Sequence, residues 1–82
     1  MNESRIETAI GMCVVSLTKH IMQKEELDYE SSYKKLLTTE LYKLLKDIDT
    51  RLFLEKNEYL KEAYDTEVKF GKGALYEYIN NE

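Results

Sequence analysis

The chain has 82 residues, of which 16 are acidic and 12 are basic, so its formal net charge is −4 at neutral pH. We expect residues 1–82 to form a single small domain, which buries only about 60% of the surface that its unfolded chain exposes. Binding to a nucleic-acid backbone needs clustered lysine and arginine, and the acidic excess argues against it. One cysteine cannot form an internal disulfide, which indicates a cytoplasmic protein.

The sequence does not predict export or insertion into a membrane. The N-terminus begins Met-Asn-Glu-Ser, with an acid where a signal peptide carries a base. The longest apolar stretch, Ala9–Leu17, is interrupted by Gly11 and Ser16, and it is far shorter than the roughly 20 residues that span a bilayer. We therefore expect no membrane partner.

A long first helix is predicted over residues 4–24. Ser4 and Glu7 have the spacing of a capping box, in which the serine accepts from a backbone amide and the glutamate reaches back. Apolar residues then recur every three or four positions, as on one face of a helix. They are Ile6, Ile10, Cys13, Val14, Leu17 and Ile21.

Two shorter helices are predicted in the middle of the chain. Asp28 is a good N-cap for the second helix, and Thr38 and Thr39 are suited to end it and to start a third helix near Glu40. The expected inner faces are Tyr33, Leu36 and Leu37, and then Leu41, Leu44, Leu45 and Ile48. Residues 47–50 favour a turn, and residues 52–54 are expected to be an extended, buried segment.

A fourth helix is predicted to start near Asn57 and to end at Gly71. Glycine readily takes the left-handed conformation that often ends a helix. Gly73 should let the chain turn again before a short terminal helix. The expected inner face of the fourth helix is Tyr59, Leu60, Ala63, Tyr64 and Val68, and the terminal helix, with Leu75, Tyr76, Tyr78 and Ile79, is expected to lie back on the core. The predicted fold is all-α: a compact bundle of four main helices, with a short C-terminal fifth helix as an addition and short loops that favour antiparallel neighbours.

Cys13 and His20 are the obvious nucleophile and base, but they do not form a catalytic pair. Seven residues in one helix separate them by about 10 Å, whereas a working pair needs about 3 Å. We expect a core cysteine and a half-exposed histidine. A dimer that joined one Cys13 to the partner's His20 in a metal sensor is the weakest of the functional hypotheses.

Two further patterns do not make a site. Asp47, Asp49 and Glu58 match three positions of a calcium loop, but Arg51 and Leu52 stand where that loop needs a ligand and a glycine. Residues 71–73 (Gly-Lys-Gly) lack the longer glycine frame and the Ser or Thr of a phosphate loop. The sequence therefore predicts a protein with no catalytic residues, no cofactor and no metal, and not an enzyme.

Tyrosine is the most informative residue type, because seven occur in 82 residues. Tyrosine is enriched at protein interfaces, although a small core also leaves tyrosines at its edge, and the sequence does not separate these alternatives. The candidate interface residues are Phe53, Tyr59, Tyr64, Tyr76 and Tyr78. They favour a protein-interaction module that binds another protein or itself, with a homodimer as one form.

The second half of the chain also resembles a group of known proteins. The residues that carry the resemblance are Leu41-Tyr42-Lys43-Leu44-Leu45, followed by Asp47, Thr50, Leu52, Tyr59 and Leu60. In these positions the chain is similar to small bacterial helical proteins of unknown function, some of which are encoded beside toxin-like genes.

The resemblance implies an antitoxin-like or accessory role, which is the alternative function. Such a regulator would act on a partner protein or on nucleic acid. For nucleic acid, the basic residues that could gather are Lys34, Lys35, Lys43, Lys46 and Arg51, but the chain has no basic recognition helix.

Overall fold

The computed structural model describes residues 3–80. This part of the chain contains five α-helices and no strand, as predicted for an all-α bundle with a short fifth helix. The helices are α1 (Glu3–Glu25), α2 (Tyr29–Leu37), α3 (Glu40–Lys46), α4 (Asn57–Phe70) and α5 (Lys72–Asn80). Two 3₁₀ turns, η1 (Ile48–Thr50) and η2 (Leu52–Leu54), lie between α3 and α4.

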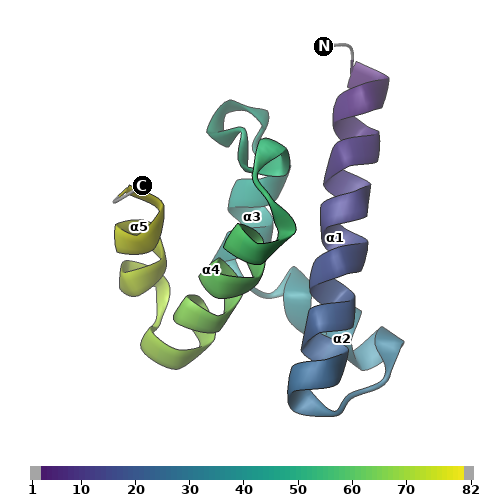
Figure 1. Ribbon diagram of the computed structural model, residues 1–82, viewed down its shortest axis with the longest axis vertical. Helices are drawn as coiled ribbons and strands as arrows, with labels where there is room; N and C mark the ends of the chain where they lie inside the picture. The colour runs from purple at the N-terminus through teal and green to yellow at the C-terminus, as the bar shows by residue number, and fades with distance from the viewer. Residues whose placement is uncertain (1–2, 81–82) are drawn as a thin grey trace.

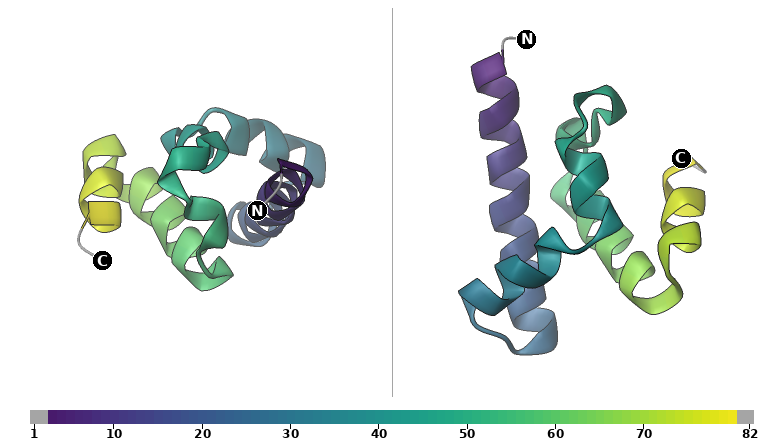
Figure 2. Two further views of the ribbon diagram at one scale, coloured as in Figure 1. Left: turned by 90° about the horizontal axis from the view of Figure 1, so that it is seen from above. Right: turned by 180° about the vertical axis from the view of Figure 1, so that it is seen from behind.

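The helices are arranged with α1 along one edge of the molecule (Figure 1). Next to α1 lie α3 and α4, and α5 lies on the far side of α4. Adjacent helices α4 and α5 run in opposite directions, as the short loops predict. In contrast, α2 crosses the C-terminal part of α1 steeply instead of running antiparallel to it (Figure 2).

The core forms where α1 meets the other helices. Its α1 residues are Cys13, Leu17 and Ile21, which belong to the predicted apolar face. The remaining buried apolar residues come from every other α-helix and from η2: Leu36, Leu41, Leu45, Leu52, Phe53, Leu60, Ala63, Tyr64 and Leu75. Burial of these side chains is the main term that stabilises the fold.

The helix ends follow the predicted capping residues. The Asp28 side chain accepts a hydrogen bond of 2.8 Å from the Ser31 amide. Hydrogen bonds from the backbone and side chain of Ser31 lower the pKa of the Asp28 carboxyl. Thr39 caps α3 by accepting from the Tyr42 amide at 3.1 Å. Gly71 has φ of 96° at the end of α4, which is the left-handed region that glycine tolerates.

Three predictions about local structure are wrong. Ser4 lies within α1 and not before it, so it does not form the predicted capping box, and its carbonyl accepts from the Thr8 hydroxyl at 3.0 Å. Residues 52–54 form a 3₁₀ turn that follows Arg51 with its positive φ of 56°, and not an extended segment; Leu52 and Phe53 are buried as predicted, but Leu54 is exposed. Gly73 lies inside α5, so the turn between the last helices depends on Gly71.

Four residues that were expected on inner faces are exposed. In α2 the buried residues are Ser32 and Leu36. Tyr33 and Leu37 each follow one of them in the chain, so they lie at the edge of the buried face and are exposed. Ile48 is exposed because α3 ends at Lys46 and its helical period does not continue. Val68 is exposed because it lies in the last turn of α4.

Candidate interaction surface

Two of the five predicted interface residues are in the core. Phe53 is 8% exposed and Tyr64 is 1% exposed, so both side chains mainly fill the core. The reason is that a small core needs large side chains to fill it, and these two lie where α1, α4 and η2 meet. Their burial does not favour the predicted interface role, which stays a prediction for both residues.

The other three predicted residues hold α5 on its neighbours. The rings of Tyr59 and Tyr78 are half-buried, with centroids 5.0 Å apart, between α4 and α5. Tyr76 is exposed, and its hydroxyl donates to Glu40 Oε2 at 2.7 Å. An interface role for Tyr59, Tyr76 and Tyr78 stays a prediction.

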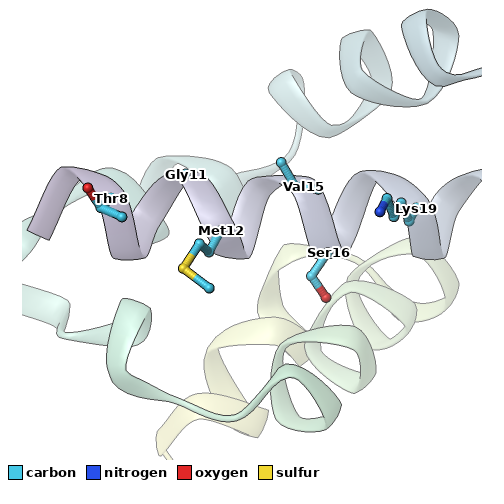
Figure 3. Close-up of a pocket in the computed structure, with 6 residues that line it drawn as sticks. All are labelled: Thr8, Gly11, Met12, Val15, Ser16 and Lys19. Atoms are coloured by element: carbon cyan, nitrogen blue, oxygen red, sulfur yellow. The ribbon is translucent and has the colours of Figure 1, made fainter. Parts of the chain in front are cut away.

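A different surface gathers exposed apolar side chains. It lies on α1 opposite the buried face, and we name it the outer face of α1 (Figure 3). Met12 is 69% exposed and Val15 is 41% exposed, and Met12 and Ser16 extend to one side of the helix while Val15 extends to the other (Figure 3). The full set is Thr8, Gly11, Met12, Val15, Ser16 and Lys19.

The outer face belongs to a stretch of α1 without charge. Residues 8–18 contain no Asp, Glu, Lys or Arg, although charged residues make up 34% of the chain. A helix on the surface of a protein normally has a charged or polar side opposite its apolar side. Here both sides of the helix are uncharged, which is the pattern of a helix that is covered on both sides. This uncharged run is a signal in the sequence for the outer face, and the number of tyrosines does not reveal it.

Gly11 is a second unusual feature of this face. It lies in the middle of a 23-residue helix, where glycine costs about 1 kcal/mol relative to alanine. Its backbone is helical, and a Cβ at this position would meet no atom within 4 Å. Nothing within the described chain requires a glycine at this position.

A groove adjoins the outer face and shares Gly11 with it. The groove runs between the N-terminal half of α1 and the helices α2 and α3, with a volume of about 440 Å³. Apolar side chains line it, with Glu3, Glu7 and Lys46 also present. The apolar lining residues are Ile6, Ile10, Val14, Tyr33, Tyr42 and Ile48. The apolar surface around α1 therefore continues from the outer face into this groove.

Polar side chains meet at the opposite end of α1, and they tie the helices together. His20 Nε2 lies 2.8 Å from Asp65 Oδ1, and Lys24 Nζ lies 3.2 Å from Asp65 Oδ2, so both join α1 to α4. Glu25 accepts from the Tyr64 hydroxyl at 2.6 Å and from Lys35, which joins α1 to α4 and α2. Burial raises the pKa of Tyr64, and its hydrogen bond to the Glu25 carboxylate raises it further.

The Cys13 thiol makes no contact with this polar cluster among residues 3–80. Cys13 is buried, its thiol faces the Phe53 carbonyl at 3.8 Å, and burial raises the pKa of the thiol. A thiol with a raised pKa is protonated at neutral pH and reacts slowly. Among residues 3–80 no three His, Cys, Asp or Glu side chains are grouped to hold a metal ion.

The basic residues of α2 and α3 are engaged with neighbouring side chains. Lys34 pairs with Glu30 at 3.2 Å, Lys35 pairs with Glu25, and Lys43 lies 3.9 Å from Glu40. Lys46 lies over the Tyr42 ring, 5.4 Å from its centroid. A phosphate backbone would have to compete with these acids for the lysines.

In the part of the chain that the structure describes, no helix combines the length and apolar character that crossing a bilayer requires. No protein-family model matches the chain, and no curated protein or solved structure matches it. The resemblance to small bacterial helical proteins stays a prediction.

Proposed function

We propose that this protein is a non-enzymatic protein-interaction module that binds through the outer face of α1. The observation that carries the proposal is the uncharged stretch of residues 8–18 with Met12 and Val15 exposed at its centre. An exposed apolar patch on a small protein marks a contact surface, because leaving it in water is unfavourable. A small domain with a thin core also gains stability when it associates.

The arrangement supports helix-to-helix binding. α1 lies along one edge of the molecule, so its outer face is open along its length (Figures 1 and 2). Gly11 and Ser16 are small, which permits a partner helix to approach at the short interaxial distances of packed helices. The adjacent groove adds apolar surface for the flanks of such a partner.

The alternative is a small regulator of the antitoxin type. If it acts on a partner protein, it can use the same face of α1, and the two functions differ only in the identity of the partner. If it acts on nucleic acid, it would need free cationic side chains. The ion pairs of Lys34, Lys35 and Lys43 favour a protein partner.

Two matched variants test the proposed function. Met12→Lys/Val15→Lys adds two charges to the outer face, and Val68→Lys/Phe70→Lys adds the same two charges to apolar residues exposed elsewhere. Each tagged variant is used to capture proteins from the native host, together with a differently tagged copy of the chain. We expect capture of a partner, whether a copy or another protein, to be lost only with the α1 variant. Capture that is unaffected by the α1 variant would contradict the proposal.

A further inference from the structure

We infer that the partner of the outer face of α1 is a helix of another protein that packs antiparallel to α1. This helix carries an acidic residue near its N-terminal end and a basic residue near its C-terminal end. The inference rests on the proposed function and names the chemistry of the partner. It comes from four residues of α1 that are spaced four apart, which we name the exposed row: Glu7, Gly11, Val15 and Lys19.

The exposed row joins the two apolar surfaces of α1. Residues four apart on a helix form a ridge, and helices pack by fitting such ridges into the grooves of a neighbour. All four residues of the row are exposed. Glu7 and Gly11 line the groove beside α2 and α3, and Gly11, Val15 and Lys19 belong to the outer face. A partner helix along this row therefore covers the outer face and the edge of the groove together.

The two charged residues of the exposed row lie at its ends and have opposite signs. Neither Glu7 nor Lys19 has an ion pair among residues 3–80. Residues 8–18 between them are uncharged, and the two charges are about 18 Å apart along the helix. A complementary partner presents a basic residue to Glu7 and an acidic residue to Lys19.

These two charges are not placed to stabilise α1 itself. An acid near the start of a helix and a base near its end interact favourably with the helix dipole, but only within the first and last turns. α1 spans Glu3–Glu25, so Glu7 lies beyond its first turn and Lys19 lies before its last turn. No residue of opposite charge lies three or four positions from either of them, where it could form a pair along the helix. Both charges are therefore available to a partner.

The direction of the partner helix follows from its own dipole. A helix is stabilised by an acid in its first turn and by a base in its last turn. In an antiparallel arrangement over about four turns, the acid that meets Lys19 lies near the N-terminus of the partner helix, and the base that meets Glu7 lies near its C-terminus. A parallel partner would need the reverse order, against its own dipole.

A peptide library tests this charge pattern without the native partner. Displayed helical peptides of about 16 residues, long enough to follow the exposed row, are selected on the folded chain. Peptides that also bind Met12→Lys/Val15→Lys are discarded. We expect the wild-type chain to enrich an acid near the N-terminus of the peptide and a base near its C-terminus. Lys19→Glu should replace the enriched acid by a base, and Glu7→Lys should replace the enriched base by an acid.

Two measurements on the selected peptides give the strength and the direction of binding. Since an exposed ion pair contributes little, reversing one charge of the row should weaken a wild-type peptide by about 2- to 30-fold, and reversing the facing charge of the peptide should restore it. Lys69→Glu and Glu77→Lys, which change exposed residues of α4 and α5, control for net charge. A nitroxide label at the N-terminus of the peptide should broaden the amide signals near Lys19 and not those near Glu7.

The outcomes separate this inference from the proposed function. Enrichment of the same charges on the wild type, Lys19→Glu and Glu7→Lys overturns the inference, as does a label that acts near Glu7. Self-association that both row variants abolish also overturns it, because a second copy would then occupy the row. A library without any peptide that depends on Met12 and Val15 overturns it as well. In each case the capture experiment with Met12→Lys/Val15→Lys still decides the proposed function separately.

Discussion

Met12 and Val15 lie one helical turn apart with both side chains exposed, although the two residues between them turn towards the core. Cys13 is buried and Val14 packs against the core from its edge. α1 therefore presents apolar side chains to the core and to the outside at the same level of the helix. This double-sided character connects the fold of one chain to its proposed association.

Gly11→Ala should separate folding from association. Alanine fits the helical backbone at this position and meets no neighbouring atom, so the free energy of unfolding should rise by about 0.5–1 kcal/mol. The added methyl group should at the same time weaken association, because it holds the partner helix away from α1. Thermal unfolding measures the first effect, and titration with a peptide selected on the wild-type chain measures the second.

Gly73→Ala is the matched control for this pair of effects. Gly73 lies within α5, away from α1, and a Cβ there also meets nothing within 4 Å. It should stabilise the fold without changing the dissociation constant. If Gly11→Ala and Gly73→Ala have the same dissociation constant, no partner approaches Gly11 closely.

Ser32→Ala should stabilise the protein. Ser32 is fully buried in α2, and its Oγ has no hydrogen-bond partner among the described residues. An unsatisfied buried hydroxyl costs about 1–3 kcal/mol, so its removal should raise the free energy of unfolding by about 1 kcal/mol. Ser31→Ala, which changes an exposed serine in the same helix, controls for the helix propensity of alanine. Equal effects in urea unfolding would mean that Ser32 Oγ is solvated.

Glu67→Gln should destabilise the start of α3. The Glu67 carboxylate on α4 accepts from the Glu40 amide at 2.8 Å and from the Leu41 amide at 2.9 Å, so it caps α3 from another helix. Glutamine has one acceptor oxygen in place of two and carries no charge to interact with the helix dipole. We expect a loss of about 1–2 kcal/mol in urea unfolding, as for other helix caps. Glu77→Gln on α5 should be neutral.

Tyr64→Phe should weaken the junction of α1 and α4. Burial tends to raise the pKa of Glu25, but its hydrogen bonds from Lys35 and Tyr64 outweigh burial and lower that pKa below its ordinary value of 4.5. The stabilisation is therefore complete above pH 4.5 and is lost as the pH falls through the lowered pKa.

Thermal unfolding across a pH series measures this effect. Tyr64→Phe should lose about 1–2 kcal/mol at neutral pH, as expected for a hydrogen bond to a charged group. It should also lose less stability than the wild type on acidification. Tyr29→Phe, which changes an exposed tyrosine of α2, is the control. Parallel pH curves for Tyr64→Phe and the wild type would show that this hydrogen bond does not set the acid sensitivity.

The sequence predicted the helices well, because their signals are local. The apolar period of α1, the caps Asp28 and Thr39, and the stop at Gly71 depend on residues within a turn or two of one another. Contacts between distant residues had no such signal. Examples are the bond of His20 to Asp65, 45 residues apart, and the cap that Glu67 provides for α3.

The candidate surface was only partly predictable. A count of tyrosines could not tell Tyr64, which fills the core, from Tyr76, which is exposed, because both lie at plausible helical positions. Residues 8–18 are uncharged in the sequence, but the apolar period within them indicates only the face that packs on the core. The helix axis had to be placed against the core before Met12 and Val15 could be assigned to the outside.

The most direct test of the association surface is to add the captured partner to ¹⁵N-labelled protein and to follow the backbone amide signals. The account predicts shifts along the outer face of α1, centred on Met12 and Val15. The amides of Val68 and Phe70, which are exposed on α4, should not move. Shifts that centre on α5, or spectra that the partner does not change, would contradict association through α1.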